Sequence, residues 1–177
     1  MDQQLGSLLK TFGSPEKALK DAIIIVVGDS GMTQILPAEQ NPVINLPALL
    51  ADSRVLRPGE DVSEETEIIL AVNETMAYVY SLQADRSLSD IANVLKNDPR
   101  IDFIAWKEKD WVHVMQGATA KQLKFKAGGN LTDAYGQSWT VEKDIGVLDL
   151  QVNAAADALD YDEYPDVLKR LSGALHS

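Results

Sequence analysis

The chain contains no cysteine, so a disulfide, a thiolate zinc site and a cysteine nucleophile are all excluded. Aromatic residues make up only 6% of its 177 residues, and histidine occurs only twice, as His113 and His176. No apolar run reaches the length of about 18 residues that a membrane span needs, and the polar start Met-Asp-Gln-Gln does not resemble a signal peptide. From these absences we expect a soluble, cytoplasmic chain without a membrane span.

Basic residues are also scarce. The 16 Lys and Arg residues are outnumbered by 27 Asp and Glu residues, which gives a net charge of −11. This charge repels the phosphates of nucleic acids, and the densest lysine group, within residues 121–126, holds only three lysines. We therefore expect no nucleic-acid partner. The composition leaves the oligomeric state open.

The first part of the chain predicts two helices followed by a strand and a loop. Apolar residues within 5–12 recur with helical spacing, and Ser14 followed by Pro15 is typical of a second helix start. Residues 22–27 form a continuous, mostly β-branched run, which is typical of a strand covered on both faces in a parallel sheet. Residues 28–31 then break the run, which predicts a loop at the carboxyl end of the strand.

The middle and the end of the chain predict a mixed unit of strands and helices. The expected elements are a short helix over 46–51, a hairpin over 67–82, a helix starting at Ser87, a second hairpin over 101–115, short strands over 123–125 and 138–141, and a last helix starting at Pro165. The order strand, strand, helix, strand, strand indicates an α+β unit of ferredoxin-like proportions.

Several side chains in this unit have an expected structural place. We expect Trp106 and Trp111 to pair across the second hairpin, Trp139 to lie in the core and His113 to be half-buried on its strand. The acidic residues within 157–166 lack the spacing of an EF-hand loop, so we expect them at the solvated start of the last helix.

The loop after the first strand is the most informative segment. It places the carboxylate of Asp29 beside Gly28, Ser30 and Gly31, with Thr33 close behind, where open α/β sheets bind their ligands. The glycines permit backbone conformations that other residues resist. A carboxylate in this position can hold a divalent metal, act as a base or cap the next turn, and the pattern alone leaves these roles open.

Residues 2–33 resemble the alkaline phosphatase superfamily, in its type I phosphodiesterase/nucleotide pyrophosphatase branch. That family has a helix pair, a strand and then an Asp-His-Gly-Met or Asp-His-Gly-Gln loop, and the stretch 163–171 is similar to its late helix. The resemblance implies that Asp29 ligates one of two metal ions of the zinc or manganese class. It puts Ser30 at the position of a histidine ligand and implies a phosphate-ester small molecule as the substrate.

The sequence departs from the family pattern in ways that concern activity. A serine hydroxyl is a poorer zinc ligand than imidazole. The family draws its nucleophile and further ligands from segments before the loop, but only Asp2 and Asp21 precede Asp29, and no histidine does. No His-Gly motif follows the late helix. We therefore expect a partial chain, an internal or C-terminal fragment, of a metal-dependent phosphohydrolase or phosphodiesterase. This fragment should be inactive alone, and it need not itself bind the metal, which belongs to the parent enzyme. The catalytic residues stay unassigned.

The expected fold is α/β with an inserted α+β subdomain, that is, part of a helix-flanked, mostly parallel sheet plus a mixed unit of ferredoxin-like size. Residues 1–36 carry the helix pair, the strand and the metal loop of the α/β core. Residues 37–150 form the inserted subdomain. Residues 151–177 form a C-terminal helix that returns to the α/β core.

Two other interpretations use the same residues. Gly-Asp-Ser after an apolar strand also opens the GDS-type serine esterases, in which Ser30 would be the nucleophile and residues 128–130 would supply an oxyanion block. The Asp-x-x-His unit of such enzymes is absent at the end of the chain, where Gly173 stands three residues before His176. In the third interpretation, the unit over 67–141 is a non-catalytic interaction or cap domain.

Overall fold

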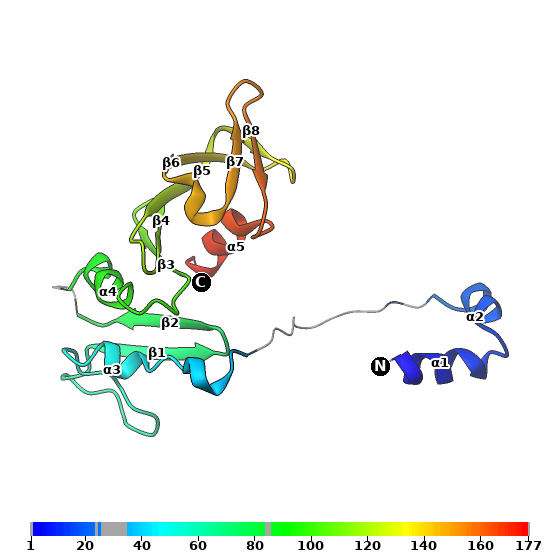
Figure 1. Cartoon of the computed structure of the whole chain (residues 1–177), viewed down its shortest axis with the longest axis horizontal. Coiled ribbons are helices and arrows are strands. Elements are labelled where there is room, and N and C mark those ends of the chain that lie inside the picture. Colours follow the sequence, from blue (N-terminus) through cyan, green and yellow to red (C-terminus); the bar gives the residue numbers. More distant parts are fainter. Residues whose placement is uncertain (1, 24, 26–34, 84–85, 177) are drawn as a thin grey trace. The chain divides into compact units, whose positions relative to one another are not determined.

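The computed structural model describes residues 2–23, 25, 35–83 and 86–176 (Figure 1). The chain divides into two compact units, Met1–Gln40 and Asn41–Ser177. The helices are α1 (Asp2–Thr11), α2 (Pro15–Asp21), α3 (Leu46–Leu49), α4 (Leu88–Leu95) and α5 (Val167–Ala174), with short 3-10 turns at Ala38–Gln40 and Ile145–Leu148. The strands are β1 (Ile68–Asn73), β2 (Met76–Ser81), β3 (Phe103–Glu108), β4 (Trp111–Gln116), β5 (Gln122–Asp133), β6 (Ser138–Lys143), β7 (Leu150–Asn153) and β8 (Ala158–Tyr161).

The N-terminal unit consists of the two helices that the sequence predicts. The start of α2 is capped by Ser14, whose hydroxyl accepts a hydrogen bond from the backbone N–H of Lys17 at 3.2 Å, while Pro15 takes the first helical position. Proline fits there because its missing N–H would have no partner within the helix. The predicted helix pair is therefore confirmed.

The predicted strand over residues 22–27 falls largely outside the described residues. Its described members, Ala22, Ile23 and Ile25, lie in neither a helix nor a strand. Ile23 is 92% exposed and Ile25 is 79% exposed, and Ala18 is the one buried side chain in the described part of this unit. The apolar run thus has no covering layer within the described residues of the N-terminal unit.

The first sheet of the second unit is the antiparallel hairpin of β1 and β2, with a tight turn in which Glu74 has a positive φ of 53°. One face of this hairpin carries Ile68, Leu70 and Val79, and α3 and α4 pack on that same face. The buried members of this core cluster are Leu50, Val55, Ile68, Ile91 and Leu95. The predicted hairpin over 67–82 and the helix after Ser87 are confirmed.

The second sheet has six strands in the order β3-β4-β5-β8-β7, with β6 also paired to β5. All pairings are antiparallel except that of β5 with β8. The 12-residue β5 has three neighbours, since β4 pairs with its first half and β8 with its last two residues, while β6 pairs with both parts across a bulge-like register shift between Ala127 and Leu131. The main core lies over this sheet and includes Phe125, Trp139, Leu159 and, from α5, Leu168.

Two features of the second unit differ from the expectation. The order strand, strand, helix, strand, strand is confirmed, but the two hairpins belong to separate sheets instead of one ferredoxin-like sheet. The acidic stretch 157–166 is not simply the start of a helix, since Ala158–Tyr161 forms β8 and Leu159 is buried in the core. Helix α5 begins after Asp166, so Pro165 precedes the cap and does not occupy the first turn.

The tryptophans of the second hairpin also pair differently from the prediction. The register sets Trp106 opposite His113 and Trp111 opposite Glu108, so the two indoles are not cross-strand partners. The cause is the short turn, which occupies only Lys109 and Asp110, so that β3 continues to Glu108 while β4 begins at Trp111. Trp139, at 2% exposure, lies in the core as expected.

The described residues therefore form a mixed α/β structure with two sheets and five helices. The division into an α/β core and an inserted subdomain stays a prediction. Within the second unit, α5 packs on the six-stranded sheet through Val167 and Leu168.

Candidate functional site

The predicted metal loop lies outside the described residues. This applies to Asp29 and Ser30, which carry the expected chemistry, and to Gly28, Gly31 and Thr33 beside them. Their roles stay predictions. The described residues contain several polar clusters outside this loop, each with its own geometry.

No group of three or more His, Asp or Glu side chains in the described part of the chain is arranged to hold a metal ion. The two histidines contact other groups. His113 stacks on Trp106 with ring centroids 5.3 Å apart, and its Nε2 lies 3.7 Å from one carboxylate, that of Glu108. The Nε2 of His176 accepts a hydrogen bond from the ammonium of Lys107 at 2.6 Å. The described residues thus do not fit a two-metal centre.

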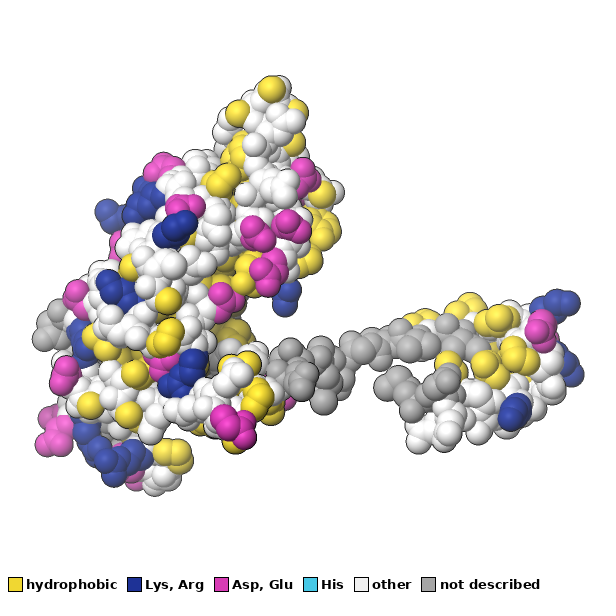
Figure 2. All heavy atoms as spheres, in the orientation of Figure 1, with side chains coloured by type: hydrophobic (Ala, Val, Ile, Leu, Met, Phe, Trp, Pro, Cys, Tyr) yellow, Lys and Arg dark blue, Asp and Glu magenta, His cyan; other side chains and the backbone are white. Residues whose placement is uncertain are grey.

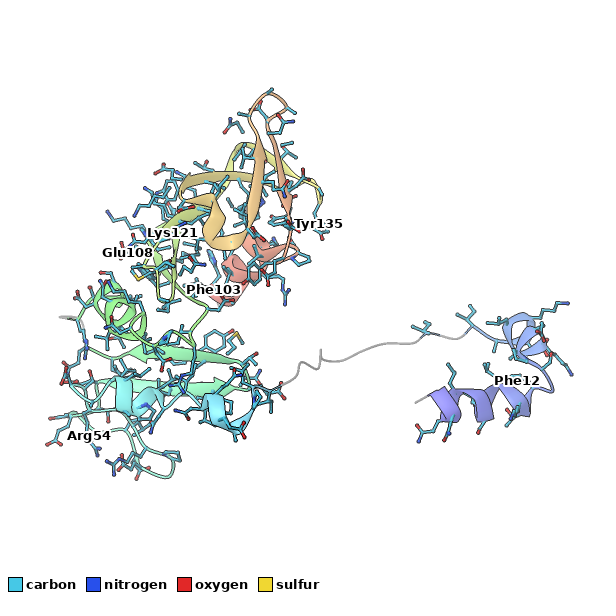
Figure 3. The ribbon with its side chains drawn as sticks, in the orientation of Figure 1. Phe12, Arg54, Phe103, Glu108, Lys121 and Tyr135 are labelled. Carbon is cyan, nitrogen blue, oxygen red and sulfur yellow. The ribbon has the colours of Figure 1, made fainter. Side chains whose placement is uncertain are left out.

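The surroundings of His113 favour its neutral form. Burial lowers the pKa of this imidazole; Glu108 opposes the shift, while Lys143 and Lys124 add to it. Glu108 is held in place because it also accepts the indole N–H of Trp106 at 2.9 Å. Figure 3 labels Glu108 on this part of the second unit. The cluster therefore packs a neutral ring against an indole, and His113 is half-buried as the sequence predicts.

The most completely built polar centre is the buried carboxylate of Asp133, at the end of β5. One oxygen accepts the backbone N–H groups of Tyr135 at 3.0 Å and Gln137 at 2.8 Å. The other accepts the indole N–H of Trp139 at 2.8 Å and the hydroxyl of Tyr161 at 2.7 Å. With 5% exposure and two donors on each oxygen, this carboxylate joins the β5–β6 turn to β8.

The electrostatics of this centre follow from those contacts. Burial raises the pKa of the Asp133 carboxyl, but the hydrogen bonds from Gln137, Trp139, Tyr161 and Tyr135 outweigh it, so the pKa lies below its ordinary value. Burial and the bond to Asp133 both raise the pKa of the Tyr161 phenol. Because every lone pair of the carboxylate is engaged, Asp133 has none left for a metal or a substrate, and its role is to fix three strands.

Sequence reasoning did not single out Asp133, although a signal was present. Aspartate followed three residues later by Gly136 is typical of a turn in which the carboxylate binds backbone N–H groups. Gly136 adopts a positive φ of 75°, as such a turn requires. The bonds to Trp139 and Tyr161 join side chains that are distant in the sequence and have no local signature.

A shallow polar depression of about 320 Å³ lies at one end of the β1–β2 hairpin. Its lining includes Asp52, Glu67, Ser81, Gln83 and Arg86. Glu67 accepts the backbone N–H of Arg54 at 3.0 Å, and the guanidinium of Arg86 bonds the hydroxyl of Ser53. Glu67 and Arg86 thus already have partners, and the hydroxyl of Ser81 donates to the carbonyl of Gln83 at 3.3 Å instead of to a carboxylate.

The glycines proposed for an esterase oxyanion block lie within a strand. Gly129 sits in β5 with a φ of 138°, and a Cβ there would meet the hydroxyl of Thr140 at 2.3 Å. The side-chain amide of Asn130 donates to Asp157 at 3.2 Å. These residues accordingly lie at the register shift of β5 between Ala127 and Leu131, and the Asn130 amide is engaged by a carboxylate.

Comparison of the chain with protein-family profiles, with curated proteins and with solved structures finds no match. Among the helices of the described residues, none combines the length and the apolar character needed to cross a bilayer.

Proposed function

We propose that this chain is part of a metal-dependent phosphohydrolase or phosphodiesterase that acts on a small phosphate ester. Asp29 is a ligand to a divalent ion of the zinc or manganese class, and Ser30 occupies the place of a second ligand. The nucleophile and the other ligands come from polypeptide outside these 177 residues, so the chain alone has no activity.

The observation that carries this proposal is the exposure of large apolar side chains among the described residues of the N-terminal unit. Leu19, Ile23 and Ile25 are each more than 60% exposed, and Figure 2 shows hydrophobic side chains at the surface of α1 and α2. Burying a side chain of this size stabilises a protein by about 1.5–3 kcal/mol, so leaving several exposed forgoes a large part of a folded domain's stability. A β-branched run of this kind belongs inside a sheet that further polypeptide completes.

The second unit supports the same division of roles. Asn41–Ser177 has its own core clusters, and its buried carboxylate Asp133 is saturated by hydrogen bonds. Within its described residues it holds no metal-ligating group. We assign it as an accessory α+β module inserted in the parent protein, with the metal site on the N-terminal unit.

The proposal is tested by restoring the missing ligand. In the Ser30→His variant, an imidazole stands beside the Asp29 carboxylate, and we expect Zn²⁺ affinity measured by calorimetry to rise at least about tenfold over the unchanged chain. Adding Asp29→Asn to this variant should remove the gain. A matched control is Ser7→His on α1, where the residues one helical turn away are Gln3, Gln4, Lys10 and Thr11 and supply no second imidazole or carboxylate, so Zn²⁺ affinity should stay unchanged.

Activity assays separate this proposal from its alternative. With Zn²⁺ or Mn²⁺ present, the unchanged chain should not hydrolyse p-nitrophenyl phosphate or bis-(p-nitrophenyl) phosphate. Turnover lost in Asp29→Ala would show that the chain is complete for catalysis. Covalent labelling of Ser30 by a fluorophosphonate would favour the serine esterase, and no gain of Zn²⁺ affinity in Ser30→His would remove the metal-ligand role of Asp29.

A further inference from the structure

The β1–β2 hairpin is apolar on both of its faces. The face with Ile68, Leu70 and Val79 is covered by α3 and α4. Side chains alternate along a strand, so Met76, Tyr78 and Tyr80 of β2 share the opposite face. Met76 is 46% exposed and Tyr80 is 51% exposed, and the Tyr78 and Tyr80 rings stack with centroids 6.2 Å apart. This face has no covering layer among the described residues.

The backbone of β2 has an unused edge beside this face. The N–H of Leu82 donates to the carbonyl of Glu67 at 2.8 Å, and bonded positions alternate in an antiparallel pair, so Tyr80 and Tyr78 also bond to β1. The N–H and C=O groups of Ala77, Val79 and Ser81 therefore point away from β1. No described residue takes up these outward groups, and Figure 1 draws β2 with a strand on one side only.

The outer edge of β1, on the opposite side of the hairpin, is partly hydrogen-bonded to another segment. On β1, the outward carbonyl of Ile68 accepts the N–H of Leu56 at 2.9 Å, and its N–H donates to Arg54. Residue Val55 also forms a parallel bridge with Ile68. One end of β1 is thus protected by the preceding segment, whereas no segment of the described residues protects β2 in this way.

The open edge of β2 also lacks the sequence features that prevent edge strands from pairing with other chains. Exposed edge strands usually carry charge, proline or a bulge that prevents pairing with another chain. Residues 76–83 contain no charged residue and no proline, although the chain as a whole carries a net charge of −11. The register of β2 with β1 is continuous from Asn73–Met76 to Ile68–Ser81, without a bulge.

We propose that β2 pairs with β2 of a second copy of this chain, antiparallel about a twofold axis, so that the two hairpins form one four-stranded sheet. The partner is a second copy because an antiparallel edge is self-complementary: each outward N–H of one copy meets an outward C=O of the other. The uncharged strand lets two acidic chains approach without like charges meeting at the seam. The Tyr78 and Tyr80 rings of both copies then lie on one continuous face.

Proline substitutions on the two edges test this pairing. Ala77→Pro removes one outward N–H of β2 and leaves the bonds to β1 intact, because that N–H does not take part in them. Val72→Pro, at the position directly across the hairpin, does the same to the outer edge of β1. Sedimentation over a dilution series should show a dimer for the unchanged chain and for Val72→Pro, and a monomer for Ala77→Pro. Urea unfolding of each variant checks that it remains folded.

Amide hydrogen exchange provides a test that needs no substitution. The N–H groups of Tyr78 and Tyr80 should be protected at every protein concentration, because they bond to β1. Those of Ala77, Val79 and Ser81 should gain protection as the concentration rises. A chain that stays monomeric, a dimer that Ala77→Pro leaves intact, or a dimer that Val72→Pro disrupts would overturn the proposal. None of these outcomes depends on the metal-site proposal.

Discussion

The indole N–H of Trp139 donates to the carboxylate of Asp133 at 2.8 Å and thereby closes the turn between β5 and β6. Both residues are buried, at 2% and 5% exposure. Tyr161 reaches the same carboxylate from β8, which is parallel to β5. A single carboxylate thus joins strands that the chain order separates, and the first two predictions concern it.

The Asp133→Asn variant should lower the free energy of unfolding by about 1–3 kcal/mol, because an amide N–H₂ then faces N–H or O–H donors on one side. Tyr161→Phe removes one donor and leaves the carboxylate with three, so it should cost only about 1 kcal/mol. Urea unfolding of both variants provides the measurement. Equal decreases in the free energy of unfolding of the two variants would contradict the conclusion that the Asp133 carboxylate joins the three strands.

The same carboxylate predicts how stability changes with pH. Since the pKa of Asp133 is lower in the folded chain than its ordinary value, the contribution is fully present above the unfolded pKa of about 3.9 and is lost as the pH falls through the folded pKa. The free energy of unfolding should therefore fall more steeply below about pH 4 in the unchanged chain than in Asp133→Asn. If the two curves stay parallel in acid, Asp133 does not titrate with unfolding.

Gly117 follows β4 where the chain passes very close to Ile101. A Cβ at Gly117 would lie 1.7 Å from the Ile101 carbonyl oxygen, a distance that only a backbone shift can relieve. Gly117→Ala should lower the free energy of unfolding by about 1–3 kcal/mol or more. Gly173, in α5, has nothing within 4 Å of its Cβ position, so Gly173→Ala should raise stability by about 0.5–1 kcal/mol. Thermal unfolding of the two variants should show a lower melting temperature for Gly117→Ala and a higher one for Gly173→Ala.

The second unit should fold without the first. The buried residues of its cores all lie between Leu50 and Leu168. The guanidinium of Arg100 bonds the carbonyl oxygens of Asn41 and Val43 at 2.6 and 2.9 Å, so a chain starting at residue 41 keeps these contacts. Residues 41–177 alone should have the same urea midpoint as the corresponding transition of the full chain. A lower midpoint would show that the core depends on residues 1–40.

Local patterns in the sequence predicted most of the secondary structure. Ser14 with Pro15 and Ser87 with Asp90 identify helix starts because the signal lies within one turn, and both caps form as expected. The hairpin of β1 and β2 follows from two apolar runs around a tight turn. Such elements need no information from distant residues.

The parts that depend on distant contacts were not predictable in this way. Strand β8 lies in an acidic stretch, and the burial of Leu159 against the main core decides its conformation. The split into two sheets depends on where β5 finds partners, which no local pattern encodes. The metal-ligand role of Asp29 follows from a resemblance to a family, and Zn²⁺ binding by Ser30→His tests it.

The bulge in β5 has a consequence for how the second unit opens. Residues 122–125 of β5 are bonded to β4, whereas Thr132 and Asp133 are paired with β8 beyond the bulge. One strand is therefore shared by two sets of partners, and the segment between them is pinned to β6, where the Thr140 hydroxyl donates to the carbonyl of Gly128 at 2.7 Å. Separation of β8 and β7 can leave the pairings of β5 with β4 and β6 in place, whereas loss of residues 122–127 removes the pairing of β4 with β5 and most of the pairing of β6.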